Sequence, residues 1–432
     1  MLTRRQMLRT GGLAGAAFAG WPGATEAQDT PGGRLPPSIA ALSSMSGQAR
    51  PITNNERLAR IEKARRLMGD AKLDAILLAG GTSLTYFSGL RFGTSERLMA
   101  LVLPASGAPF VVCPAFEVDR LNEQLRRSPL GRVDIRAWLE TDSPYQLVGR
   151  TLRERGLSTG RLGVEETVRF VFADGIARAN PALTIASAAP VTAGCRMIKD
   201  THELELLRLA CRATLACYRA LHGALEPGMT EATARSLVAA GYARLGFRGF
   251  VSVQFDTYTA LPHGSEEPQA LRPNSIVMLD DGCVAEGYQS DLTRTFVMGK
   301  ATDKMKQVFD IVVRAQRAAL AAARPGVSLA SVDAAARKVV VDAGYGPGFT
   351  YFTHRLGHGL GMDMHEWPYL VEHNMYGWDS PTLQPGMVFS NEPGIYIPGE
   401  FGVRLEDDMV ITETGAELMT PPSQDIERPF DH

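Results

Sequence analysis

The chain has 432 residues, of which 45% are hydrophobic and 21% are charged, and these proportions exclude a largely disordered chain, a collagen-like fibre and a coiled coil. Its 45 basic and 47 acidic residues leave a net charge of −2, so charge indicates neither nucleic acid nor an anionic membrane as a partner. The length predicts two to three domains. The five cysteines are odd in number and lack paired spacing, which excludes a disulfide framework and a zinc-finger module.

Residues 1–27 are predicted to be an export signal. Residues 3–8 (TRRQML) resemble the twin-arginine motif, and an apolar, glycine-rich stretch follows at residues 13–21. Small residues at Thr25 and Ala27 predict cleavage after Ala27. The apolar stretch is too short and too rich in glycine to span a bilayer, so we expect no stable membrane insertion. The alternatives are a membrane anchor and a disordered tail. We expect the twin-arginine machinery to deliver the mature chain to the periplasm or otherwise outside the cytoplasm.

The remainder is predicted to form a linker at residues 28–54 and two domains. In the first, residues 55–194, helix and strand patterns alternate, which predicts an α/β fold. Its clearest elements are a helix over 55–68 and strands over 74–79, 98–103 and 110–113. The second, residues 195–432, is predicted to be α+β. Its expected helices cover 202–225, a segment from Thr230 onward, 302–323 and 329–343, and its expected strands cover 250–255, 275–284, 288–298 and 387–412.

Two aspartates of the second domain are candidates for a functional site. Asp280 follows the apolar run 276–279, and Asp291 lies 11 positions later, beyond a turn at Glu286-Gly287. A hairpin of that size can bring both side chains to one face. A carboxylate in an apolar strand is costly unless a cation or hydrogen bonds compensate it. From this segment alone, a metal site and an aspartate that caps the turn are equally good interpretations.

A histidine cluster follows in the sequence. Three of the eight histidines, His354, His358 and His365, lie within twelve residues. Glycines on both sides of His358 permit close approach of the backbone. Two acids then follow strand-like segments, Glu392 and Glu406. Four carboxylates and one imidazole make an oxygen-rich donor set, which suits a pair of manganese, iron, cobalt or zinc ions.

These segments resemble the pita-bread metallopeptidases, the family of aminopeptidase P and prolidase, with creatinase as a metal-free relative. The resemblance covers nearly all of the chain after residue 54, and residues 196–203 resemble the family's join between a creatinase-type N-terminal domain and the catalytic domain. It implies two divalent ions per chain, manganese foremost with zinc, cobalt or iron as alternatives, and a homodimer. The implied metal ligands are Asp280, Asp291, His358, Glu392 and Glu406, with Asp291 and Glu406 bridging the ions.

The resemblance also implies the roles of the surrounding residues. Glu392 would accept the proton of the attacking water, and His365 would help to stabilise the oxyanion. His263 or His354 would position the substrate and protonate the departing proline nitrogen, and Arg404 would support the site. Four aromatic residues either line a proline pocket or belong to the core: Tyr351, Phe352, Trp367 and Tyr396.

The substrate expected from this resemblance is a peptide with proline at its second position. Prolidases carry an arginine that holds the dipeptide carboxylate, in the loop before the first metal-binding glutamate. Residues 366–386 contain no lysine or arginine, which favours an aminopeptidase P-like enzyme acting on longer peptides. Prolidase, and a non-peptidase hydrolase or lyase on the same scaffold, are the alternatives. Asp281 departs from the apolar or small residue usual in the family, and the residues alone leave open whether Asp280 or Asp281 is the ligand.

Overall fold

The structure is a computed structural model that describes residues 34–372 and 381–431. The predicted export signal at residues 1–27 lies outside these ranges and stays a prediction. Among the helices of the described ranges, none combines the length and the apolar character needed to cross a membrane.

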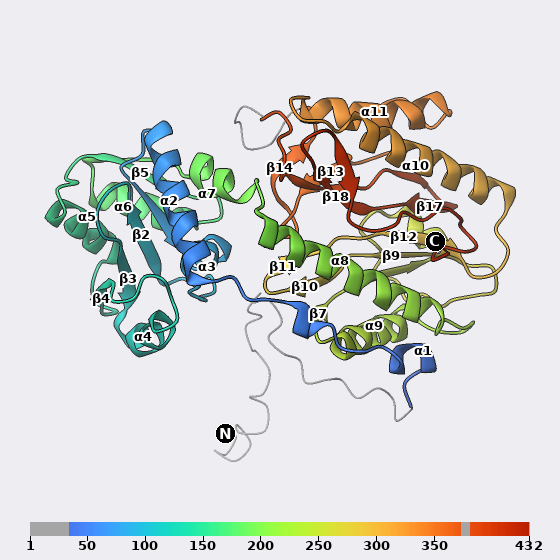
Figure 1. Cartoon of the computed structure of the whole chain (residues 1–432), viewed down its shortest axis with the longest axis horizontal. Coiled ribbons are helices and arrows are strands. Elements are labelled where there is room, and N and C mark those ends of the chain that lie inside the picture. Colours follow the sequence, from blue (N-terminus) through green and yellow to red (C-terminus); the bar gives the residue numbers. More distant parts are fainter. Residues whose placement is uncertain (1–33, 373–380, 432) are drawn as a thin grey trace, which may run out of the picture. The chain divides into compact units, whose positions relative to one another are not determined.

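The N-terminal half is a six-stranded sheet between two layers of helices (Figure 1). Its strands are β1 (Ala75–Ala79), β2 (Ala100–Pro104), β3 (Phe110–Pro114), β4 (Asp134–Trp138), β5 (Gly160–Val164) and β6 (Leu183–Ser187). Its helices are α2 (Asn54–Asp70), α3 (Thr82–Ser88), α4 (Val118–Leu125), α5 (Pro144–Glu154), α6 (Phe170–Ala179) and α7 (Ala189–Arg196). The strand order is β4-β3-β2-β1-β5-β6, and only β2 is antiparallel to its neighbours.

Burial on both faces explains the apolar runs of this sheet. Every residue of β1, β2 and β3 is buried, as expected for strands that helices cover on both sides. Helices α2, α3, α4 and α7 supply apolar side chains to the core on one face, and α5 and α6 supply them on the other. The α/β prediction for this half is therefore confirmed.

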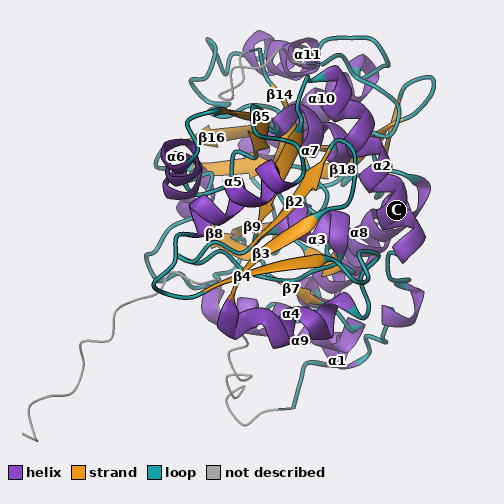
Figure 2. Ribbon diagram, turned by 90° about the vertical axis from the view of Figure 1, so that its left-hand side faces the viewer, coloured by secondary structure: helices purple, strands orange, loops and turns teal. Residues whose placement is uncertain are grey.

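The C-terminal half is an α+β fold, as predicted, in which strands lie between helices (Figure 2). A short helix, α1 (Pro37–Ala40), precedes both halves, and the helices of this half are α8 (Thr201–His222), α9 (Glu231–Leu245), α10 (Asp303–Ala322) and α11 (Leu329–Asp342). The strands before α10 are β7 (Arg248–Gly249), β8 (Ser252–Phe255), β9 (Ile276–Asp280), β10 (Cys283–Ala285), β11 (Tyr288–Gln289) and β12 (Arg294–Val297). Those after α11 are β13 (Gly357–Gly359), β14 (Glu366–Leu370), β15 (Val388–Asn391), β16 (Gly394–Ile397), β17 (Phe401–Arg404), β18 (Asp407–Ile411) and β19 (Ala416–Leu418).

Two helix pairs cover the sheets of this half. Helices α8 and α9 pack on each other and share a core with the sheets β12-β9-β8 and β11-β10-β7. Helices α10 and α11 pack on each other and share a core with β15, β17 and β18. Sheet β14-β13-β15-β18-β19 is antiparallel throughout.

The predicted hairpin over 275–298 is interrupted in both strands. Strand β9 ends at Asp280 and β10 begins at Cys283, because Asp281 has a left-handed backbone with φ of 101°. On the return, β11 ends at Gln289 and β12 begins at Arg294. The break moves β10 and β11 into a different sheet from β9 and β12. Asp280 remains the last paired residue of β9, opposite Ser252 of β8, whereas Asp291 lies in irregular backbone before β12.

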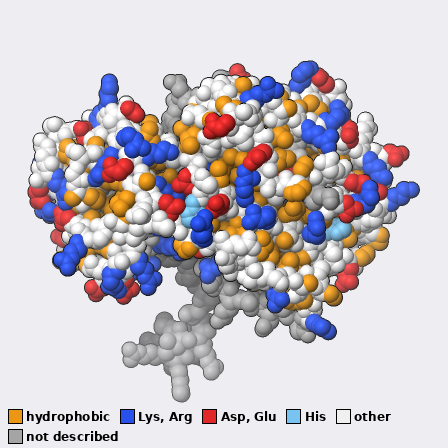
Figure 3. All heavy atoms as spheres, in the orientation of Figure 1, with side chains coloured by type: hydrophobic (Ala, Val, Ile, Leu, Met, Phe, Trp, Pro, Cys, Tyr) orange, Lys and Arg blue, Asp and Glu red, His pale blue; other side chains and the backbone are white. Residues whose placement is uncertain are grey.

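The surface has no large area of one charge sign on the face drawn in Figure 3, where basic and acidic side chains are interspersed. This distribution agrees with the net charge of −2.

Arg294 provides a test of the core beneath the sheets. It is fully buried, and its Nη2 lies 2.6 Å from Asp407 Oδ1, which is equally buried. Arg294→Met should lower the free energy of unfolding by about 3–5 kcal/mol, because it leaves a buried carboxylate without its cation. Urea denaturation measures this change. Lys338→Met removes an exposed ion pair with Asp342 and should change stability little; equal effects of the two variants would contradict the argument.

Candidate metal centre

The five predicted metal ligands converge on one place in the C-terminal half. Asp280 ends β9, Asp291 precedes β12, His358 is the middle residue of β13, Glu392 follows β15, and Glu406 lies between β17 and β18. Three overlapping groups have ligand atoms within 4.8 Å of one another: Asp280, Asp291 and Glu406; His358, Glu392 and Glu406; Asp291, His358 and His365. Asp280, rather than Asp281, belongs to these groups. His365, predicted to have a supporting role, lies among the candidate ligands.

Close strand packing brings these side chains together. A Cβ atom added at Gly357 would lie 2.0 Å from the carbonyl oxygen of Ser390, and one at Gly359 would lie 2.6 Å from that of Glu366. Only glycine therefore allows the strands on both sides of β13 to approach His358 so closely. On the opposite side of the centre, Thr293 and Glu406 exchange backbone hydrogen bonds of 3.3 and 3.2 Å.

The ring of His358 is oriented as a metal ligand would be. Its Nδ1 donates to the carbonyl oxygen of Gly359 at 3.1 Å, which directs Nε2 toward the acids. Nε2 lies 3.6 Å from Asp291 Oδ2 and 3.5 Å from Glu392 Oε1. Burial lowers the pKa of His358 well below its usual value, so an unprotonated nitrogen faces two carboxylates. A cation between these atoms would remove the repulsion among three electron-rich groups.

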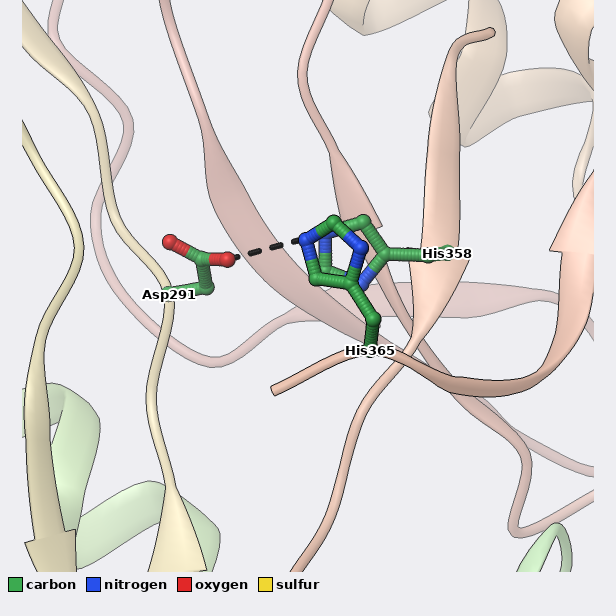
Figure 4. A group of neighbouring side chains, drawn as sticks. All are labelled: Asp291, His358 and His365. Atoms are coloured by element: carbon green, nitrogen blue, oxygen red, sulfur yellow. Dashed lines mark ion pairs between the residues drawn. The ribbon is translucent and has the colours of Figure 1, made fainter. Parts of the chain in front are cut away.

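The ring of His365 stacks on that of His358, with centroids 3.8 Å apart and an interplanar angle of 23°. Figure 4 shows Asp291 directed toward these two rings from a different segment of the chain. His365 is more exposed than the other members of the three groups.

The electrostatics of the carboxylates favour a bound cation. Burial, with the charges of neighbouring carboxylates, raises the pKa values of Asp291 and Glu406 well above their usual range. Burial also raises the pKa of Glu392 to about 8, with Asp280 contributing and Arg404 opposing. Divalent cations supply the charge that such a cluster needs, and the donor set of carboxylates and imidazole fits them.

Arg404 and Thr293 hold the side of the centre at Asp280. The Thr293 hydroxyl lies 2.6 Å from both Asp280 Oδ1 and Glu406 Oε2 and accepts from Arg404 Nε at 3.1 Å. Arg404 forms an ion pair with Asp280 through Nη2. Arg404 was predicted to support the site. Thr293 was missed, although it lies two positions after Asp291, the spacing that puts side chains of a strand on one face.

His354 is engaged at both ring nitrogens. Nδ1 donates to the carbonyl oxygen of Arg355 at 2.7 Å, and Nε2 accepts from the Tyr396 hydroxyl at 2.8 Å. Burial and the nearby Arg404 lower the pKa of His354 to about 3. The ring of His354 therefore has no free N–H, although it lines the same cavity as His263.

Buried charges fix the segment that carries His365. Glu366 is buried, and it accepts from Lys199 Nζ at 2.8 Å and from Arg196. Arg196 also lies 2.6 Å from Asp363 Oδ2. Burial alone would raise the pKa of Glu366, but Arg196 and Lys199 lower it. Residues predicted to join the two domains thus also hold the histidine segment in place.

The centre opens into a cavity of about 880 Å³. None of the four aromatic residues proposed from the sequence lines it; Phe352 and Tyr396, for example, are core residues. The aromatic residues that do line it are Phe250, Phe349 and Tyr369. Asp281 also lines it and accepts from the backbone N–H of Ser252 at 3.2 Å, and burial and the charge of Asp280 raise its pKa to about 7.

The comparisons with known proteins agree with this geometry. The family model described as "Metallopeptidase family M24" matches residues 205–413, and that described as "Creatinase/Prolidase N-terminal domain" matches residues 60–198. "Probable dipeptidase PepE" of Mycobacterium tuberculosis is 38% identical over 363 residues, which is 83% of this chain and 92% of that protein. "Xaa-Pro dipeptidase" of Lactobacillus delbrueckii is 31% identical, covering 85% and 98%. The crystal structure of dipeptidase PepE from Mycobacterium ulcerans is similar with a TM-score of 0.80 and 36% identity, covering 88% of this chain and 99% of that one.

Asp291→Asn should remove at least one metal ion per chain and nearly all hydrolysis, because Asp291 belongs to two of the three ligand groups. Asp281→Asn is the matched control: it removes a carboxylate of the same cavity that belongs to none of the groups, so metal content should persist. Elemental analysis of both purified variants measures the difference. Full metal content in Asp291→Asn would refute the assignment.

The stability of the metal-free protein should fall as pH rises. The folded-state pKa of Glu392 lies near 8, above the ordinary 4.5, so the folded protein binds the proton more tightly than the unfolded chain does. The resulting stabilisation is complete below pH 4.5 and is lost as pH rises through about 8. Thermal unfolding in chelator at pH 6 and pH 9 tests this, and Glu392→Gln should flatten the pH dependence. An unchanged slope in that variant would contradict the role of Glu392.

Proposed function

This chain belongs to metallopeptidase family M24, and on that premise we propose that it hydrolyses the peptide bond before proline in Xaa-Pro dipeptides. The family and the hydrolytic peptidase activity follow from the comparisons. The preference for dipeptides reverses the aminopeptidase P-like expectation from the sequence. Its support is that relatives covering most of this chain are named dipeptidases, one of them an Xaa-Pro dipeptidase.

The observation that carries the proposal is the convergence of four carboxylates and His358 at the floor of a cavity. We propose that this set holds two divalent ions, with manganese favoured by the oxygen-rich donors and iron, cobalt or zinc as alternatives. When bound, such ions polarise the substrate carbonyl and lower the pKa of water to near neutrality. Proline requires a dedicated enzyme because its ring fixes the backbone and its nitrogen carries no hydrogen.

Different residues around the centre are assigned to accept and to donate protons. Glu392 is placed to accept a proton from water, since its carboxylate belongs to one of the ligand groups and its pKa is raised in the absence of cations. The departing proline nitrogen needs a proton donor. His354 has no free N–H, so His263 on the cavity wall is the better donor of the two predicted candidates. His365 faces the centre and can donate to the developing oxyanion.

Xaa-Pro dipeptides should be cleaved with a higher kcat/KM than the corresponding Xaa-Pro-Yaa tripeptides. An assay of the metal-loaded enzyme with Ala-Pro and Ala-Pro-Ala measures the ratio. A preference for the tripeptide would restore the aminopeptidase P-like interpretation. Failure to cleave either peptide would favour a non-peptidase hydrolase or lyase on this scaffold.

His365→Ala should lower kcat by about 10²- to 10⁴-fold, the range of a positioned proton donor, while metal content stays unchanged. Metal content should stay unchanged because His365 is exposed, whereas the proposed ligands are more buried. The fall in kcat is expected because the His365 ring stacks on His358 at the centre. Kinetics and elemental analysis of the same preparation separate the two effects. Loss of a metal ion would instead make His365 a ligand.

A further inference from the structure

Three arginines line the cavity, and they differ in their partners. Arg404 pairs with Asp280, and Arg235 Nη2 lies 3.7 Å from Glu231. Arg355 has no carboxylate within ion-pair distance among residues 34–372 and 381–431. Its guanidinium carbon lies 4.1 Å from the centroid of the Tyr369 ring, so an aromatic face holds its position while its N–H groups make no hydrogen bond within the described chain.

The position of Arg355 places this charge beside the metal centre. It immediately follows His354 and precedes β13, and Tyr369 of β14 is the register partner of His358. The guanidinium therefore stands over the strand next to a proposed ligand. Arg355 lines the same cavity as Glu392 and His365, which places its charge near the point where substrate would react.

A half-buried guanidinium whose donors have no partner among the described residues, and which lines a cavity, is complementary to an anion. It presents five N–H donors in a planar fork that matches a carboxylate in two parallel hydrogen bonds. Stacking on Tyr369 restricts the plane of the fork in advance, which reduces the entropy lost on binding.

We propose that Arg355 binds the C-terminal carboxylate of the dipeptide, with the Tyr369 ring orienting the guanidinium. This inference rests on the proposed dipeptidase function and names the residue that makes the enzyme selective for dipeptides over longer peptides. In an Xaa-Pro dipeptide the carboxylate follows the proline directly. In a tripeptide an uncharged amide occupies that place and the carboxylate lies about 3.5 Å farther along the chain, so the guanidinium would lose its charged partner.

The proposal explains how a dipeptide carboxylate can be bound although residues 366–386 contain no lysine or arginine. That absence led the sequence analysis to expect longer substrates, because the carboxylate had no partner there. Arg355 supplies a cation from the opposite side of the same hairpin, since Tyr369 lies on β14 and Arg355 precedes β13.

The test compares Ala-Pro with Ala-Pro amide, which keeps the scissile bond and removes the negative charge. The wild-type enzyme should prefer Ala-Pro by about 10- to 100-fold in kcat/KM, the range of a lost charge-assisted bidentate pair. Arg355→Gln should bring the ratio near one by raising KM for Ala-Pro alone, and Arg355→Lys should restore part of the preference. A ratio unchanged in Arg355→Gln, or an equal fall for both substrates, overturns the proposal.

Arg235→Gln is the matched control, because it removes a cavity arginine that already has a carboxylate partner. It should leave the preference for the free carboxylate intact; loss of the preference in this variant would move the subsite to Arg235 and overturn the assignment. Metal content and thermal midpoint, measured for each variant, identify a variant that has lost its fold. If wild-type enzyme cleaves neither substrate, the proposed function fails; if it cleaves Ala-Pro but Arg355→Gln behaves as wild type, only the inference fails.

Discussion

Mutual repulsion among buried carboxylates is the constraint on which this half of the protein depends. Asp280, Asp291, Glu392 and Glu406 come from separate strands or strand ends, yet their oxygens fall within overlapping groups of 4.8 Å. Arg404 compensates Asp280 directly, but one guanidinium cannot balance four acids. The repulsion among these carboxylates can be relieved in two ways: the carboxylates take up protons, or cations bind between them. A cation bound here would contribute to stability as well as to catalysis, since its ligands come from strands of different sheets.

The same constraint shapes the residues beneath the centre. Glu406, Asp407 and Asp408 are consecutive and all buried, an arrangement that the chain tolerates because the three side chains have different partners. Glu406 faces the metal centre, and Asp407 pairs with Arg294. Asp408 accepts from Cys211 Sγ and from the backbone N–H of Asp291. A buried carboxylate thus fixes the backbone of a ligand, and strand alternation separates charges that are adjacent in sequence.

The sequence predicted those features that a local pattern determines. Alternating helix and strand signals indicated the α/β half, and the acids at strand ends, with the glycines around His358, indicated the centre. The interrupted hairpin was not predictable, because it depends on the left-handed backbone of Asp281, a conformation uncommon for residues other than glycine. Of the two alternatives that the sequence left open for the four aromatic residues, a proline pocket and the core, the structure does not support the pocket, because distance along the chain from a ligand does not tell which face of a strand meets the cavity. Tyr396 is near Glu392 in sequence but donates to His354 within the wall.

The expectation of longer substrates shows that a sequence pattern does not reveal which side chains meet in space. It relied on the absence of a cation from one segment, whereas a binding site requires only that a cation reach the right point in space. In an antiparallel pair, side chains on two strands share one location, so an arginine before β13 can reach a point that a residue of β14 also faces. Here β14 provides the aromatic Tyr369 and the residue before β13 provides the charge. On this proposal, the preferred substrate length depends on Arg355 and Tyr369 together, and neither residue alone would have predicted it from the sequence.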